Sequence, residues 1–290
     1  MRLAFLGTPQ AAVPTLRALV SSGHDVAVVV TRPDRRRGRG GDESHSPVHE
    51  AALELGLTVA HSLGELDGAD VERGVVVAYG ALVPAATLAR VPMLNVHFSL
   101  LPRWRGAAPV ERAILAGDDV TGVSVMSLDV DLDTGPVHLT RSVEVDDLSV
   151  SALTSQLADV GADALVEVLA TPDLLNSPHP QVGEPVYAPK IRPETYHLDP
   201  EMALVDALRT VRLERAFTIV AGRRVRVVSA RAAESAPAPG TVMVAGSHLV
   251  LGLRDGGLEL DDVVPEGGRT MSGFAWWIGA RLNAETARWT

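Results

Sequence analysis

The chain has 290 residues, of which 46% are hydrophobic and 21% are charged, an ordinary globular composition with enough length for two domains. It contains no cysteine, which excludes a disulfide framework, a thiolate metal site and a cysteine nucleophile. The formal net charge of −10 excludes a polycation, but nearly all of the positive charge is arginine, because Lys190 is the only lysine, and the arginines gather in clusters.

Short apolar runs alternate with helical patterns along the first part of the chain. The expected strands are residues 3–6, 25–30, 57–60, 75–78 and 93–97. The expected helices are residues 11–20, 47–55, 84–89 and 107–116. The continuous β-branched run at 25–30 is typical of a strand that is buried on both faces. This alternation predicts a Rossmann-like α/β fold, with a mostly parallel sheet and helices on both of its faces.

The pattern changes after residue 120. Residues 122–128 and 137–145 read as two strands with no helix between them, which predicts a hairpin-like extension of the sheet. Residues 150–169 follow as a long helix, for which Asp147 or Ser149 is a plausible N-cap. The next stretch, 171–194, is dense in proline and predicts an extended connection.

The last third of the chain predicts a smaller domain of a different type. A helix at 200–211 precedes short strands that are separated by glycine and charged turns. The expected strands are 224–229, 240–244, 248–253 and 258–263. This spacing predicts a small, OB-like β-barrel, a class of fold that often binds nucleic acid. We therefore expect a first domain over 1–177, a linker over 178–195 and a C-terminal barrel over 196–290.

Several common sites and segments are not expected from this sequence. The turn after the first strand, G-T-P-Q-A-A, has one glycine instead of the three of the dinucleotide fingerprint, and no P-loop is present. The nine histidines include no H-E-x-x-H motif, so we expect no metal site. The N-terminal MRLAFLG does not read as a signal peptide, and no stretch approaches the roughly 18 apolar residues that span a bilayer. We expect a cytoplasmic protein without a membrane partner.

The strand at 93–97 ends in an amide and an imidazole. Asn95 and His97 are two residues apart on a strand, so their side chains share a face, at the sheet edge where open parallel sheets bind ligands. Together they suit a reaction in which negative charge builds up on a carbonyl oxygen. Asp133, in the turn D-T-G, is the candidate carboxylate that would orient the imidazole and favour its protonated form. The alternative is a structural hydrogen-bonding pair beside an ordinary turn.

Taken together, these residues resemble the signature of the 10-formyltetrahydrofolate-dependent formyltransferases. The matching residues are Asn95 and His97, the run Ser99-Leu100-Leu101-Pro102, the pair Arg105-Gly106 and the turn Asp133-Thr134-Gly135. Further stretches are closer to the methionyl-tRNA formyltransferase branch than to the glycinamide ribonucleotide and sugar-amine branches. They are FLGTP at 5–9, TRPDRRRGRG at 31–40, VVVAYGALVP at 75–84, YAPKI at 187–191 and VPEGGRTMSGFAWWIGARL at 264–282. The resemblance therefore covers nearly the whole chain.

The resemblance implies transfer of a formyl group from N10 of 10-formyltetrahydrofolate to the α-amine of methionyl initiator tRNA, in translation initiation and without a metal. It implies that Asn95 donates to the oxyanion, that His97 stabilises it and shuttles a proton, and that Asp133 holds His97 and assists deprotonation of the amine. The expected folate-binding residues are Ser99, Leu100, Leu101, Pro102, Tyr79, Gly80 and Leu82. Ordinary core packing is the alternative for the leucines.

Two arginine clusters are candidates for contacts to RNA phosphates. The first consists of Arg32, Arg35, Arg36, Arg37 and Arg39, in a glycine-rich loop after the second strand. The second includes Arg209, Arg212, Arg223 and Arg224, with Arg215 and Arg226 nearby. The alternatives are a solvated charge run for the first cluster and a barrel rim laced with ion pairs for the second.

Other functions stay open at this point. One is formyl transfer to a sugar amine or another small amine, in which case both arginine clusters would be incidental. A second is a catalytically silent module that binds folate or RNA, and a third is hydrolysis of formyl-folate. We expect the protein to act as a monomer.

Overall fold

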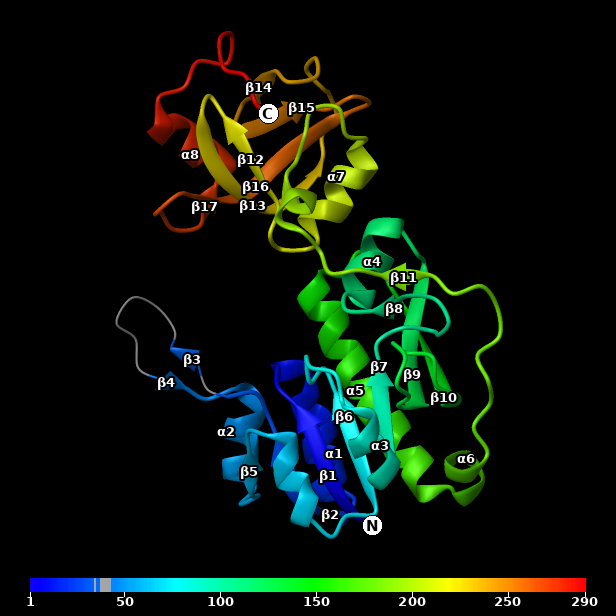
Figure 1. Cartoon of the computed structure of the whole chain (residues 1–290). Helices are drawn as coiled ribbons and strands as arrows, with labels where there is room; N and C mark the ends of the chain where they lie inside the picture. The colour runs from blue at the N-terminus through cyan, green and yellow to red at the C-terminus, as the bar shows by residue number, and fades with distance from the viewer. Residues whose placement is uncertain (34, 37–42) are drawn as a thin grey trace. The chain divides into compact units, whose positions relative to one another are not determined.

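The computed structural model describes residues 1–33, 35–36 and 43–290 (Figure 1). Contacts divide the chain into two compact units. The first unit comprises Met1–Val110, Asp119–Glu144 and Leu153–Pro189. The second comprises Glu111–Asp118, Val145–Ala152 and Lys190–Thr290. The domain boundaries expected from the sequence, at residues 177 and 195, stay a prediction.

The first unit contains a seven-stranded sheet with the order β10-β9-β7-β6-β1-β2-β5. Its strands are β1 (Arg2–Gly7), β2 (Asp25–Val30), β5 (Val59–Ala60), β6 (Arg73–Val77), β7 (Met93–His97), β9 (Val120–Ser127) and β10 (Val137–Glu144). The first five pair in parallel, whereas β9 runs antiparallel to both β7 and β10. The predicted α/β fold and its hairpin extension are confirmed. The strand order reverses beside β1, and such a switch point is where doubly wound sheets bind ligands.

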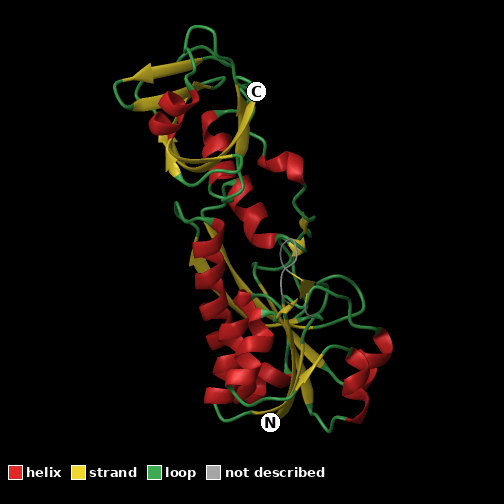
Figure 2. Ribbon diagram, turned by 90° about the vertical axis from the view of Figure 1, so that its left-hand side faces the viewer, coloured by secondary structure: helices red, strands yellow, loops and turns green. Residues whose placement is uncertain are grey.

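Helices cover both faces of this sheet (Figure 2). The helices of this unit are α1 (Val13–Ser21), α2 (Pro47–Glu54), α3 (Ala85–Arg90), most of α5 (Val150–Ala170) and α6 (Pro172–Asn176), with the 3-10 turns η1 (Gln10–Ala12) and η2 (Leu63–Gly68). Most of α4 (Pro109–Ala116) belongs to the second unit. Ala4 and Leu6 of β1 pack in one cluster with Leu66 of η2, with Leu88 of α3 against it. On another face of the sheet, Val96 of β7 contacts the backbone of α5 at Gly161. Burial on both sides explains the uninterrupted apolar runs.

The N-terminus of α5 lies in the second unit and is capped as one of the two alternatives predicted. The Ser149 hydroxyl oxygen accepts a hydrogen bond from the backbone N–H of Ala152 at 3.3 Å. In the same unit, residues 200–203 form a turn instead of the expected first turn of a helix, and α7 (Leu204–Val211) begins later. The cause is that two acidic side chains bind this backbone: Asp199 accepts from Glu201 N–H at 2.8 Å, and Asp255 accepts from Leu204 N–H at 2.7 Å.

The proline-dense stretch is more structured than an extended connection. It contains α6, the short strand β11 (Tyr187–Ala188) and the 3-10 turn η3 (Pro193–Tyr196). β11 pairs in parallel with β8 (Arg105–Gly106), and His179 bridges Val137 of β10. We refer to residues 178–188 as the strap. These pairings join residues 82 apart, at Arg105 and Tyr187, and 42 apart, at Val137 and His179, so no local pattern in the sequence could indicate them.

The second unit holds a curled antiparallel sheet with the order β12-β13-β16-β15-β14, and β17 pairs with β16. The strands are β12 (Phe217–Val220), β13 (Arg223–Ala232), β14 (Val242–Ala245), β15 (His248–Gly252), β16 (Gly257–Pro265) and β17 (Met271–Ser272). The helix α8 (Gly273–Ala280) follows. The C-terminal residues bridge the two edges of the sheet, because Trp289 pairs with Val220 of β12 and Arg288 pairs with Thr241 beside β14. The smaller β domain predicted from the sequence is confirmed.

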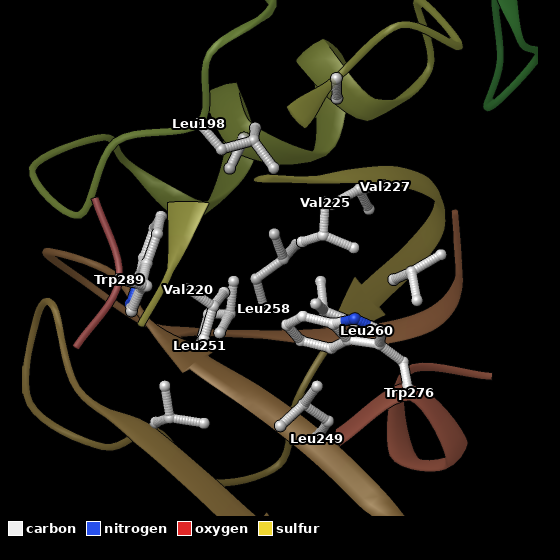
Figure 3. Close-up of a cluster of buried hydrophobic side chains, with 14 of the residues drawn as sticks. Leu198, Val220, Val225, Val227, Leu249, Leu251, Leu258, Leu260, Trp276 and Trp289 are labelled. Atoms are coloured by element: carbon white, nitrogen blue, oxygen red, sulfur yellow. The ribbon is translucent and has the colours of Figure 1, made fainter. Parts of the chain in front are cut away.

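Alternating apolar residues fill the interior of this sheet (Figure 3). Val225 and Val227 of β13 point inward and alternate with the exposed Arg224, Arg226 and Val228, which is the two-residue period of a strand with one solvated face. Leu249, Leu258 and Leu260 come from neighbouring strands, and Trp276 and Trp289 pack against them. Among the described residues, none of the helices combines the length and apolarity needed to cross a bilayer.

A buried histidine connects the hairpin to α6. His138 Nδ1 donates to the Leu174 carbonyl at 2.9 Å, and its Nε2 lies 2.8 Å from the Ser127 hydroxyl, which donates to it. Burial lowers the pKa of His138 below its ordinary value of 6.5; the hydrogen bond to Leu174 acts against this and the Arg73 charge adds to it. The folded state therefore favours the neutral ring.

This histidine predicts a loss of stability in acid. A lowered folded-state pKa stabilises the protein fully above the unfolded pKa of 6.5, and that contribution is lost as the pH falls through the folded value. We expect the melting temperature to fall between pH 7 and pH 5, and to fall less in the His138→Gln variant. Thermal melts of both proteins over this range test it. Equal slopes would rule out a contribution from His138.

Candidate active site

Asn95, His97 and Asp133 lie in the first unit and are all nearly buried, with exposed fractions of 8%, 6% and 8%. Asn95 and His97 follow Met93 on one face of β7. Met93 belongs to the apolar cluster that η2 and α3 cover, so the two polar residues continue that face toward the carboxyl end of the strand. Their backbones pair with Met126 and Ser124 of β9, which fixes the register of both side chains.

Each nitrogen of the His97 ring faces a different group. Nε2 lies 2.9 Å from the Trp104 carbonyl oxygen, so Nε2 carries a hydrogen and donates it. Nδ1 lies 3.7 Å from Asp133 Oδ2, an ion-pair contact that is longer than a hydrogen bond. The carboxylate therefore faces Nδ1 without saturating it, and a substrate atom beside the ring could hydrogen-bond there.

The Asp133 carboxylate is held by the backbone opposite it. Its Oδ2 accepts a hydrogen bond from the Gly106 N–H at 2.8 Å. Asp133 itself has φ of +52°, in the left-handed region, which costs a non-glycine residue on the order of 1–3 kcal/mol and is typical of functional sites. The structure thus brings the imidazole and the carboxylate together from segments 36 residues apart.

The loop between His97 and Gly106 is braced by contacts that the sequence did not indicate. Trp104 adopts φ of +63° and Gly106 φ of +124°. A Cβ at Gly106 would lie 2.8 Å from the Ala188 carbonyl oxygen, so glycine lets the strap approach closely. Ser124 was missed entirely: its hydroxyl donates to the Ser99 carbonyl at 2.7 Å and accepts from Leu101 N–H at 3.1 Å. A lone serine within the apolar run of β9 was the available signal.

The residues predicted to bind folate fall into two groups. Leu82 is 81% exposed, and Gly80 is also exposed, so both are accessible to a ligand. In contrast, Ser99 is fully buried and its hydroxyl donates to the Arg103 carbonyl at 2.6 Å. Tyr79 is buried in the apolar cluster, where burial raises its pKa and the Arg32 charge opposes that rise. Both side chains are thus buried, and their contacts with folate stay a prediction.

The remaining members of this predicted set, Leu100, Leu101 and Pro102, are half-buried. The Leu100 side chain lies against Gly122 of β9, where an added Cβ would be 2.6 Å from Leu100 Cδ2. For Leu100 the structure therefore favours the alternative of core packing over stacking on a pterin.

The arginines of the first cluster are only partly described. Arg37 and Arg39 lie outside the described residues, and Arg35 and Arg36 form β3 (Arg35–Arg36), which pairs with β4 (Glu43–Ser44). The Arg32 guanidinium donates to the Gly80 carbonyl at 2.6 Å. It thus braces the loop after β6, with part of its surface left exposed.

The second cluster divides into structural and exposed arginines. Arg212 donates to the Leu148 carbonyl at 2.8 Å and to the Val145 carbonyl at 3.3 Å, and burial lowers its pKa. Arg209 packs on Gly117 and lies 3.5 Å from Asp206. Backbone carbonyls thus accept two of the five N–H donors of Arg212, and its contact with RNA stays a prediction.

Arg223 and Arg224 are exposed on β13, where the Arg224 guanidinium lies over the Phe217 ring at 3.8 Å. A guanidinium on an aromatic face, on a strand with further exposed arginines, is suited to contacts with nucleic acid. As for metals, no three His, Asp or Glu side chains gather as ligands within the described ranges.

Comparisons with known proteins agree over both units. Residues 1–169 match the family model described as Formyl transferase, and residues 190–281 match Formyl transferase, C-terminal domain. A methionyl-tRNA formyltransferase of Ruegeria pomeroyi is 42% identical over 260 residues, covering 84% of this chain and 86% of that relative. One of Acidothermus cellulolyticus is 40% identical over 318 residues, covering 97% and 98%.

A solved structure with low sequence identity shows the same fold. It is an N-formyltransferase from Helicobacter canadensis in complex with folinic acid and dTDP-3-aminofucose. It superposes with a TM-score of 0.69 at 13% identity, covering 89% of this chain and 98% of that one.

Proposed function

This chain belongs to the methionyl-tRNA formyltransferases, and from that premise we propose that Asn95, His97 and Asp133 carry the transfer of a formyl group from 10-formyltetrahydrofolate to the α-amine of methionyl initiator tRNA. The observation that carries the proposal is the buried contact of the imidazole with the carboxylate at 3.7 Å, beside Asn95 on the same strand face. The protein would serve translation initiation, in the cytoplasm and as a monomer.

The reaction begins when the amine attacks the formyl carbon, which forms a carbon–nitrogen bond and places a negative charge on the formyl oxygen. The Asn95 amide donates a hydrogen bond to this oxyanion. Because His97 Nε2 donates to Trp104, only Nδ1 is available to a substrate, and in the imidazolium form its N–H donates to the same oxygen or carries a proton onward. Preorganised donors of this kind stabilise the transition state more than the ground state.

Collapse of the intermediate breaks the bond between the formyl carbon and N10. The amine must lose one proton and N10 must gain one, so the reaction needs a relay. Asp133 faces Nδ1 and can accept the proton of the attacking amine, while the imidazolium form of His97 delivers its Nδ1 proton to N10; transfer of the proton from Asp133 to Nδ1 then restores both groups. Gly106 N–H keeps the carboxylate in place throughout.

A paired-substrate assay tests this function. The full-length protein is incubated with 10-formyltetrahydrofolate and either methionyl initiator tRNA, a nucleotide-linked amino sugar or no acceptor. We expect rapid formylation of the tRNA and only background with the others. Preferential transfer to the sugar would make this a small-amine formyltransferase, and release of formate without an acceptor would make it a hydrolase.

The exposed arginines predict a salt-dependent interaction with the tRNA. Replacing Arg223 and Arg224 by alanine should raise the KM for tRNA and reduce the salt slope of log KM by about 2, since each phosphate contact contributes about 1. The KM for folate should not change. Arg231→Ala is the matched control, because Arg231 lies on the same strand but is paired with Glu259 and Asp261. If the control and the double variant behave alike, β13 is not part of the RNA interface.

A further inference from the structure

The strap contributes one polar side chain to the turn that carries Asp133. Gln181 Nε2 donates to the Asp133 carbonyl at 2.8 Å and to the Gly135 carbonyl at 2.9 Å. Its Oε1 accepts from Arg105, at 3.0 Å from Nε and 2.6 Å from Nη2. Gln181 is partly buried, and Arg105 lies in the loop that follows His97.

The surroundings fix which way the amide of Gln181 points. Arg105 has only donors, so it must meet the amide oxygen, and the two carbonyls are only acceptors, so they must meet the amide nitrogen. The amide oxygen of Gln181 thus accepts from Arg105, and its amide nitrogen donates to both carbonyls of the turn. A carboxylate of the same shape would bind Arg105 but would place an oxygen against both carbonyls.

These bonds hold the part of the chain that determines where the catalytic carboxylate lies. Asp133 sits at φ of +52°, a conformation that an aspartate keeps only when its surroundings hold it. Gln181 binds the carbonyl of Asp133 itself and that of Gly135, two residues later. Arg105, which donates to the same amide, directly precedes Gly106, whose N–H donates to the Asp133 carboxylate at 2.8 Å. The Gln181 side chain thus connects the turn that carries Asp133 with Arg105, in the segment that follows His97.

We propose that Gln181 is a positioning residue that holds the Asp133 turn, and through it the carboxylate, against His97. The proposal rests on the function proposed above and adds the strap to the parts that determine the catalytic rate. Because the Gln181 amide binds the Asp133 turn and Arg105 and not the His97 ring, it acts through Asp133. Its loss should lower kcat and leave both substrates' KM unchanged.

Gln181→Glu is the test variant. We expect kcat for tRNA formylation to fall by about 10- to 100-fold, the size of effect that small misplacements of a catalytic group produce. Glu184→Gln, the reverse exchange at an exposed position three residues away on the strap, is the matched control and should keep the wild-type kcat. Gln181→Met, which removes both donors without adding a charge, should lower kcat in the same way. Thermal melts show whether each variant remains folded.

A double-mutant cycle separates positioning from a general structural role. In an Asp133→Asn background, Gln181→Glu should lower kcat further by less than about twofold, because the group on which it acts is already gone. Full additivity, or a wild-type kcat in a folded Gln181→Glu variant, would overturn the proposal. An inactive wild-type protein would instead contradict the proposed function, so the two failures are distinguishable.

Discussion

Replacing Asn95 by alanine is expected to lower kcat for formyl transfer by about 10²–10³-fold, the usual loss when one oxyanion donor is removed. The charge on the formyl oxygen develops only as the amine attacks. Loss of the hydrogen bond therefore raises the free energy of the transition state more than that of the bound substrates. We therefore expect kcat and kcat/KM to fall together, with both KM values near wild type. Single-turnover transfer to methionyl initiator tRNA measures the chemical step directly.

The Asn95 variant needs a control for folding. Backbone pairing of β7 with β6 and β9 does not involve the Asn95 side chain, so the variant should melt like wild type. Asn176→Ala removes the same amide from an exposed position at the end of α6 and should keep full activity. A folded Asn95→Ala variant with a wild-type kcat would remove this residue from the mechanism.

Replacing Trp289 by alanine is expected to destabilise the second unit by about 3–5 kcal/mol, the range for deleting a buried aromatic side chain. Trp289 is 1% exposed and packs among the interior leucines and valines. It also belongs to the segment that bridges β12 and β14, with Thr290 and Ile219 exchanging two backbone hydrogen bonds at 2.9 Å. A cavity at this point would open the sheet where its two edges meet.

Chemical denaturation measures this loss. Trp276 and Trp277 remain in the second unit and report its unfolding by fluorescence. Ile278→Ala is the control, since Ile278 is 58% exposed on the neighbouring helix and its truncation should cost less than about 0.5 kcal/mol. Equal free energies of unfolding for the two variants would show that Trp289 does not hold the sheet closed.

The first unit could be predicted well because its signals are local. The runs at 25–30 and 93–97 match β2 and β7 residue for residue, since strands buried on both faces are largely apolar. α8 could not be found in this way: GFAWWIGA is apolar almost throughout, so it has no polar face to reveal a helical period. β12 is only four residues long, too short for its alternation to stand out.

The site was predictable in its chemistry but not in its supports. An amide and an imidazole two residues apart on a strand imply a shared face, and Asn95 and His97 do share a face of β7. Gln181 carries no comparable signal, because its amide donates to backbone carbonyls that lie 48 and 46 residues away in the sequence. The same reason explains why the contacts of Arg212 were not predicted. Its neighbours in the sequence suggest an exposed charge cluster, but backbone carbonyls accept hydrogen bonds from two of its donors.

The most direct measurement of the central claim is a crystal structure of the protein with a stable formyl-folate analogue bound. We predict that the formyl oxygen lies within about 2.7–3.2 Å of both the Asn95 amide nitrogen and His97 Nδ1, with the Asp133 carboxylate on the side from which the amine would approach. A formyl group that binds away from these three side chains, in an otherwise active protein, would contradict the account.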